Sequence, residues 1–295
     1  MTMSNIAATR QVLVAAADQS GVPADGATLI RDGSNTLYSL PDGVVARVSR
    51  PGGRAVAERE VRIAWWLADS GVPVVRPLLE TQPAVIGDRA VTWWEQFPPH
   101  REASPAELGA VLRQLHALPV PGDLGLAEFD PFDELTSNIA VAGNWLSTKD
   151  RAWLQDLIRR LRADYAHLPA WRPSCVLHGD AWQGNVAVPE HGPPVLLDLE
   201  QVGIGDPVWD LAPLAVDYAD FSRVSTEEYG TFTDAYGADI TTWSGFRTVA
   251  TICELRWTAF VLSKADGANR ATTEAHHRVA CLRGEVARPW SWSAF

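Results

Sequence analysis

Four polar residues in the second half of the chain could together take part in the transfer of a phosphate group. His178, Asp180 and Asn185 follow an apolar stretch at 175–177, and Asp198 follows another apolar stretch. Interpreted as a strand, a loop and a returning hairpin, this segment places an amide oxygen and two carboxylates at the mouth of one hairpin. Mg²⁺ prefers such oxygen ligands and completes its shell with water and substrate phosphates. The remaining carboxylate, Asp180, can then accept a proton from a hydroxyl group. The pattern therefore favours phosphoryl transfer.

Short strands near the N-terminus are the first elements that must position a phosphate site. Stretches at 27–31, 36–40 and 44–49 are rich in β-branched and aliphatic residues, with turn residues between them. They predict an antiparallel meander. Apolar residues at helical spacing follow at 56–70, which predicts a helix. Further strands are expected at 76–80 and 90–97.

The remainder of the chain has mostly helical spacing after the break at Pro98-Pro99. We therefore expect a small sheet-rich lobe at 1–97 and a larger lobe at 98–295. Short strands at 175–177, 186–188 and 195–197 interrupt this helical part. The helices are expected at 105–118, 150–168, 207–218, 226–236, 245–263 and 272–286.

The motif His178-x-Asp180-x-x-x-x-Asn185 is followed by Asp198-Leu199-Glu200 and then by Gly205-Asp206-Pro207-Val208-Trp209-Asp210. In this order the motifs resemble the aminoglycoside phosphotransferase family and its choline kinase and fructosamine kinase relatives. The resemblance extends from about Ala27 to the helices before Arg288. It implies an α+β, two-lobed protein-kinase-like fold. The small antiparallel β-sheet lobe would carry one helix, and the larger helical lobe would contain a short catalytic β-hairpin.

The resemblance implies a role for each matching residue. Asp180 would be the catalytic base and His178 would brace its loop. Asn185 and Asp198 would hold Mg²⁺, with Glu200 beside the metal.

The first lobe would bind ATP or GTP. The loop Gly33-Ser34-Asn35 would cover the nucleotide phosphates with backbone N–H groups. The hinge, with Glu95 and Phe97, would meet the edge of the base.

The chain departs from the family pattern at the lysine that contacts the α- and β-phosphates. Its only lysines are Lys149 and Lys264, and neither lies in the first lobe. Arg47 in the matching strand is expected to take this place, because a guanidinium group can bind phosphate with two hydrogen bonds and stays charged. Glu60 is the expected ion-pair partner of Arg47, and Glu58 is the alternative.

Three further polar residues have simpler interpretations. Asp206 is predicted to cap a helix that begins near Pro207. Asp210, one turn later, would favour the positive end of that helix. His116 is expected to be packed at the end of its own helix.

The charge of one segment indicates the class of acceptor. Residues 198–239 contain ten acidic side chains and a single arginine, Arg223, in the region where relatives bind the acceptor. With Asp217, Asp220 and Trp182 as candidate contacts, this charge favours an amine-bearing antibiotic or an amino sugar. Solvent-exposed acidic helices would explain the same count.

Other functions stay open at this point. A kinase of a sugar, a choline-like or homoserine-like alcohol, or a macrolide would use the same fold. A nucleotide-binding pseudokinase is an alternative of another class, as is a metal-dependent hydrolase that uses His178, Asp180 and Asp198.

The net charge of −11 and the pI near 5.1 argue against binding to nucleic acid, which requires clustered Lys and Arg. No apolar run is long enough for a membrane span. The three cysteines form no CxxC pair, so we expect a cytoplasmic protein without membrane partners.

Overall fold

The computed structural model describes residues 2–295, except for the side chains of residues 2–4 and 144. Its contacts divide the chain into two compact units. The first unit contains the chain up to Ala103, together with Pro121–Gly125 and Gln183–Val202. The second unit contains Ser104–Val120, Leu126–Trp182 and Gly203–Phe295. The division therefore does not follow one cut in the sequence, and the boundary expected at residue 97 stays a prediction.

The first unit is built on an antiparallel sheet with the strand order β1-β2-β3-β5-β4. The predicted meander is confirmed as its first three strands, and Arg47 in the third lies opposite Thr92 in β5. The strands are β1 (Thr28–Asp32), β2 (Thr36–Leu40), β3 (Val44–Val48), β4 (Ala84–Ile86) and β5 (Arg89–Glu95).

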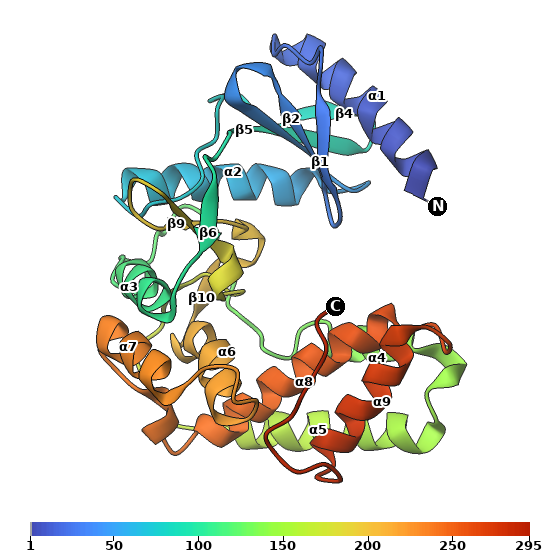
Figure 1. Ribbon diagram of the computed structural model, residues 1–295, viewed down its shortest axis with the longest axis vertical. Helices are drawn as coiled ribbons and strands as arrows, with labels where there is room; N and C mark the ends of the chain where they lie inside the picture. The colour runs from blue at the N-terminus through green and yellow to red at the C-terminus, as the bar shows by residue number, and fades with distance from the viewer. Residues whose placement is uncertain (1) are drawn as a thin grey trace. The chain divides into compact units, whose positions relative to one another are not determined.

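A helix covers each face of this sheet (Figure 1). Side chains of α1 (Thr2–Ser20) share one hydrophobic core with Ala46 and Val48 of β3. Successive strand residues point to opposite faces, so Arg47 points toward α2 (Arg54–Asp69) instead. The first unit thus has two helices on its sheet, where the resemblance implied one.

The segment 76–80 differs from its predicted strand. The N–H of Leu78 donates to the carbonyl of Trp93 at 2.8 Å, and the carbonyl of Arg76 accepts from the N–H of Glu95 at 2.9 Å. Pro77 and Trp94 form the isolated antiparallel bridge between these two bonds, and no neighbouring pair extends it into a ladder. The segment is an extended edge beside β5.

A three-stranded sheet completes the first unit and carries the predicted hairpin. β8 (Val186–Pro189) pairs with β9 (Val195–Leu196) on one side and with β6 (His100–Glu102) on the other. The N–H of Leu196 also donates to the carbonyl of Pro73 at 3.0 Å. The hairpin is therefore attached to the chain that follows α2.

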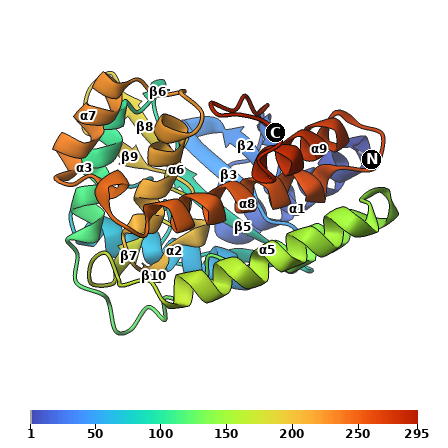
Figure 2. The same ribbon diagram turned by 90° about the horizontal axis from the view of Figure 1, so that it is seen from below.

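The second unit is mainly helical, and Figure 2 shows α8 running beside α5 and α9. One short pair of strands, β7 (Cys175–Leu177) with β10 (Gly203–Gly205), enters it. Its helices are α3 (Pro105–His116), α4 (Leu135–Val141), α5 (Thr148–Ala166), α6 (Val208–Ala219), α7 (Thr226–Tyr236), α8 (Phe246–Lys264) and α9 (Arg270–Leu282). Among the helices described, none combines the length and apolarity that crossing a membrane requires.

The C-terminal segment packs against the helices of the second unit. The indoles of Trp290 and Trp292 are 3% and 6% exposed and stack with their ring centroids 5.4 Å apart. The Arg288 guanidinium lies 3.9 Å from the Trp290 ring centroid, and Arg223 donates to the carbonyl of Trp292 at 2.8 Å. These two tryptophans are part of the core of the unit.

Candidate active site

Arg47 is the centre of a charged cluster in the first unit. Its guanidinium group donates to the carboxylates of Glu60 and Glu200, and one of its nitrogens lies 3.9 Å from Asp198 Oδ1. The expected ion pair of Arg47 with Glu60 is therefore present. The alternative partner, Glu58, instead accepts from Arg54 at 2.7 Å.

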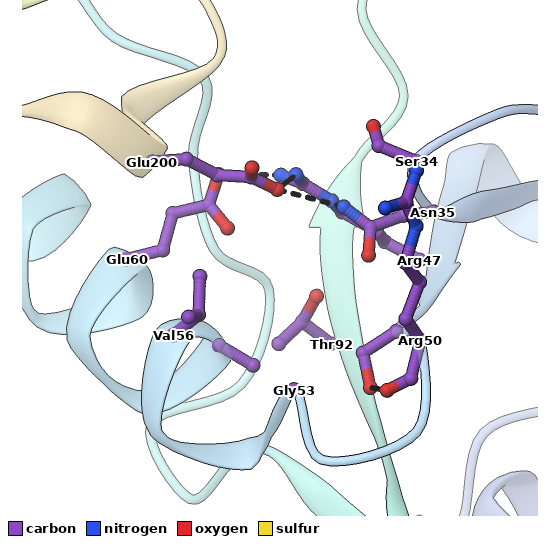
Figure 3. Close-up of a pocket in the computed structure, with 11 residues that line it drawn as sticks. Ser34, Asn35, Arg47, Arg50, Gly53, Val56, Glu60, Thr92 and Glu200 are labelled. Carbon is purple, nitrogen blue, oxygen red and sulfur yellow. Dashed lines mark hydrogen bonds and ion pairs between the residues drawn. The ribbon is translucent and has the colours of Figure 1, made fainter. Parts of the chain in front are cut away.

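The glycine-containing loop lies against this cluster. Asn35, directly before β2, donates from Nδ2 to Glu200 Oε1 at 2.7 Å. Figure 3 shows Arg47 pointing toward Glu200, with Ser34 and Asn35 close by. Together they line a cavity of about 160 Å³. The cavity joins the predicted phosphate loop, the predicted phosphate-binding arginine and its glutamate partner in one unit.

Burial affects the charge of Glu60 within this cluster. Its side chain is 4% exposed. Burial raises the pKa of Glu60 to about 7, and the neighbouring carboxylates of Glu200 and Asp198 add to this rise against the opposing effect of Arg47. One guanidinium group among three carboxylates leaves the cluster with excess negative charge once all are ionised.

Asn185 and Asp198 lie at the same end of the β8–β9 hairpin. Asn185 directly precedes β8, and its backbone carbonyl accepts from the N–H of Leu197 at 2.9 Å. Asp198 follows with a left-handed backbone, φ 55°, and its side chain is 43% exposed. The structure thus brings these two predicted metal ligands to one place in the first unit.

The donors at the hairpin end fit Mg²⁺. Nowhere in residues 2–295 do three or more His, Cys, Asp or Glu side chains gather into a site that could hold a metal ion. Mg²⁺ needs no such cage, because it binds to one or two carboxylates together with substrate phosphates and water. Asp198 and Asn185 supply a carboxylate and an amide oxygen. Glu200 is already bound by Arg47 and Asn35.

The predicted catalytic loop follows a strand that is not part of that hairpin. His178 and Asp180 follow β7, which pairs with β10 in the second unit. The β8–β9 hairpin therefore carries Asn185 and Asp198, while His178 and Asp180 follow the separate β7–β10 pair. The reason is that the three buried residues of β7 find their partner in Gly203–Gly205. His178 is fully buried, and Asp180 is exposed.

Asp210 fixes the backbone of this loop, a role that the sequence interpretation missed. Its carboxylate is 1% exposed and accepts from the N–H groups of His178 at 2.6 Å and Gly179 at 2.8 Å. His116 Nε2 donates to the same carboxylate at 3.0 Å, and the Tyr236 hydroxyl lies 3.0 Å from His116 Nδ1. The packed position expected for His116 is confirmed.

Asp210 stays ionised in this buried setting. Burial by itself would raise its pKa, but the hydrogen bond and charge of His116 and the bonds from the loop hold the pKa of Asp210 below its ordinary value. The nearby Asp206 accepts from the N–H of Val208 at 3.1 Å, but the N-cap of α6 is Pro207, one residue later than predicted. Its other oxygen accepts from the N–H of Trp171 at 2.6 Å.

The expected acceptor contacts are mostly occupied by arginines. Asp220 is 2% exposed, and Arg247 and Arg288 donate to it at 2.8 Å and 2.6 Å. Asp217 accepts from Arg223 at 2.9 Å. A carboxylate paired in this way attracts a cationic ligand only weakly. The count of acidic residues therefore overstated the electrostatic attraction of Asp217 and Asp220 for a cationic acceptor. Trp182 is 49% exposed.

The hinge expected to bind the base is partly engaged within the protein. The backbone N–H of Gln96 donates to the carbonyl of Gly43 at 2.7 Å, and the backbone N–H of Glu95 donates to the carbonyl of Arg76. The side chain of Glu95 is exposed and that of Phe97 is half-buried.

The model of the phosphotransferase enzyme family matches residues 27–248. No curated protein matches the chain. Among solved structures, a choline/ethanolamine kinase family protein from Mesorhizobium loti has a TM-score of 0.62 and 22% identity, with 89% of this chain and 88% of that chain covered.

Two further solved structures show the same architecture at lower identity. Amicoumacin kinase hAmiN, in complex with AMP-PNP, Ca²⁺ and Ami, has a TM-score of 0.74 and 14% identity, covering 97% of this chain and 95% of that one. Choline kinase LicA from Streptococcus pneumoniae has a TM-score of 0.69 and 15% identity, covering 94% and 99%. The expected protein-kinase-like α+β fold is confirmed, and the chain belongs to the phosphotransferase enzyme family, whose members are small-molecule kinases.

Proposed function

We propose that this enzyme transfers the γ-phosphoryl group of ATP or GTP to a hydroxyl group of a small molecule in a magnesium-dependent reaction. The observation that carries the proposal is the bridge from Arg47 to Glu60 and Glu200 beside Ser34 and Asn35. A guanidinium group and a loop of backbone N–H groups are what phosphate oxygens bind. The nucleotide phosphates would replace part of the carboxylate contacts of Arg47.

The residues beyond this cavity have separate tasks in the proposal. Asn185 and Asp198 would hold Mg²⁺, which, when bound, neutralises charge on the phosphates. Asp180 would orient the acceptor hydroxyl and take its proton. Asp210 would keep the loop of Asp180 in place through its bonds to the N–H groups of His178 and Gly179.

The hinge would supply a hydrogen-bond donor to the purine edge. The N–H groups of Glu95 and Gln96 are bonded within the protein, and Pro98 and Pro99 have none. Between residues 95 and 99, this leaves the N–H of Phe97. Either adenine N1 or guanine O6 could accept it, so both nucleotides remain candidates.

The acceptor we favour is an amine-bearing antibiotic or an amino sugar. The support is the similarity in fold to a kinase named for amicoumacin, together with exposed acidic side chains on α7, at Glu227 and Asp234. A choline-like alcohol is the second candidate, because two similar structures are a choline/ethanolamine kinase family protein and a choline kinase. Trp182 would lie against either acceptor.

A transfer assay with an acceptor panel tests the proposal. Purified enzyme with Mg²⁺ and γ-labelled ATP or GTP would be offered aminoglycosides, amino sugars, choline, ethanolamine and macrolides, with Asp180→Asn as the blank. We expect label on one class of amine-bearing alcohol, and none with the blank. Label on macrolides alone would refute the favoured acceptor, and transfer to nothing would count against the proposed reaction.

A further inference from the structure

We propose that Arg59 is a positioning residue that holds the metal loop, defined as residues 198–202, in its metal-binding conformation. The inference rests on the proposed function, because it assumes that Asp198 in this loop binds Mg²⁺. It adds a residue to which none of the sequence motifs pointed.

Arg59 contacts the metal loop through the backbone. Its Nη1 donates to the carbonyl of Glu200 at 2.9 Å, and its Nη2 donates to the carbonyl of Val202. The planar guanidinium fork can serve two acceptors at once from a single rigid group. These two carbonyls belong to the end of the short 3₁₀ turn at Leu199–Gln201. Arg59 therefore fixes the turn from its C-terminal side.

The loop needs such support because it begins with an unfavourable backbone conformation. Asp198 has φ 55° and ψ 69°, a left-handed region that is unfavourable for a residue with a Cβ. Such a conformation persists when the surrounding contacts determine it. The direction of the Asp198 carboxylate depends on this backbone, so the bonds from Arg59 to the turn determine where the metal ligand points.

The same helix also holds the phosphate-binding arginine. Glu60, the next residue on α2, is bound to Arg47, while Arg59 is bound to the metal loop. Two adjacent residues of one helix thus contact the two parts of the site that must meet the same magnesium–nucleotide complex. A change at Arg59 should alter the metal requirement while Glu60 keeps its bond to Arg47.

The test compares Arg59→Gln with Arg62→Gln. Arg62 lies on the same helix, is exposed, and is not part of the proposed site, so its variant controls for the loss of a charge on α2. Amide hydrogen exchange of residues 198–202 is measured without nucleotide or metal. The Mg²⁺ concentration that half-saturates binding of a non-hydrolysable nucleotide is measured by calorimetry.

We expect Arg59→Gln to speed exchange in residues 198–202 and to raise the Mg²⁺ midpoint by roughly tenfold, as loss of an outer-shell partner does. Arg62→Gln should leave both unchanged. If Arg59→Gln fails to fold, Arg59→Lys, which can reach one carbonyl at a time, should give a smaller change in the same direction. Suppose that the wild type binds the magnesium–nucleotide complex, but Arg59→Gln and Arg62→Gln have the same Mg²⁺ midpoint and the same exchange rate in residues 198–202. That result would overturn this inference and leave the proposed function standing. A wild type that binds no magnesium–nucleotide complex would overturn the proposed function as well.

Discussion

Replacing Asp210 by asparagine tests the contacts that hold the catalytic loop. The carboxylate accepts hydrogen bonds from His178 N, Gly179 N and His116 Nε2. Asparagine has the same size but one acceptor oxygen, and its amino group would face a backbone N–H. The retained oxygen can take the position of Oδ2, which accepts from His178 N and His116 Nε2, so the bond from Gly179 N to Oδ1 is the one that is lost. A hydrogen bond to a charged group is worth about 1.5–3 kcal/mol, so we expect a fall of that size in the free energy of unfolding.

Urea unfolding followed by tryptophan fluorescence measures this change, with Asp234→Asn as the matched control. Asp234 is exposed on α7, so its variant should stay within about 0.5 kcal/mol of wild type. Because the folded pKa of Asp210 is depressed, its contribution is present above the unfolded value of about 3.9 and is lost as pH falls through the folded pKa. A loss below about 1 kcal/mol for Asp210→Asn at neutral pH would refute this account of the loop.

Four further changes have defined outcomes. Asp180→Ala should lower turnover by roughly 10²-fold or more with nucleotide binding kept, whereas Asp198→Ala should weaken binding of the magnesium–nucleotide complex; rapid-quench kinetics and calorimetry separate the two. Burial raises the pKa of Glu60 to about 7, so its effect on stability declines as pH rises from the unfolded value of about 4.3 toward 7. Glu60→Gln should remove that decline from melting temperatures recorded across this range. Trp292→Ala should cost about 3–5 kcal/mol in unfolding measurements, because the indole is 6% exposed in the core.

Local patterns predicted most of the elements that carry the site. The meander that places Arg47 opposite Thr92 and the hairpin of β8 and β9 both have clear alternation and turn residues. The strand β6 has three exposed polar residues, His-Arg-Glu, and exists because β8 offers it a partner. The short helix α4 contains Thr, Ser and Asn, which are weak helix formers. Neither could be predicted from local periodicity.

The contacts of the site were harder to predict than its elements. Glu200 meets Arg47 across 153 residues and Asn35 across 165, and no spacing along the chain indicates such a meeting. The interpretation of Asp210 as a helix-start charge ignored the buried N–H groups that need an acceptor. The acidic count over 198–239 overlooked Arg247 and Arg288, which lie outside that window in the sequence and bind Asp220 in the fold.

The central claim is that this chain binds a nucleotide together with magnesium for phosphoryl transfer. Calorimetric titration of the wild-type protein with a non-hydrolysable ATP or GTP analogue, with and without Mg²⁺, tests it most directly. The account predicts one site per chain, with binding that is markedly tighter when Mg²⁺ is present and weakened by Asp198→Ala. Absence of binding to both analogues, or affinity that does not respond to Mg²⁺ or to Asp198→Ala, would contradict it.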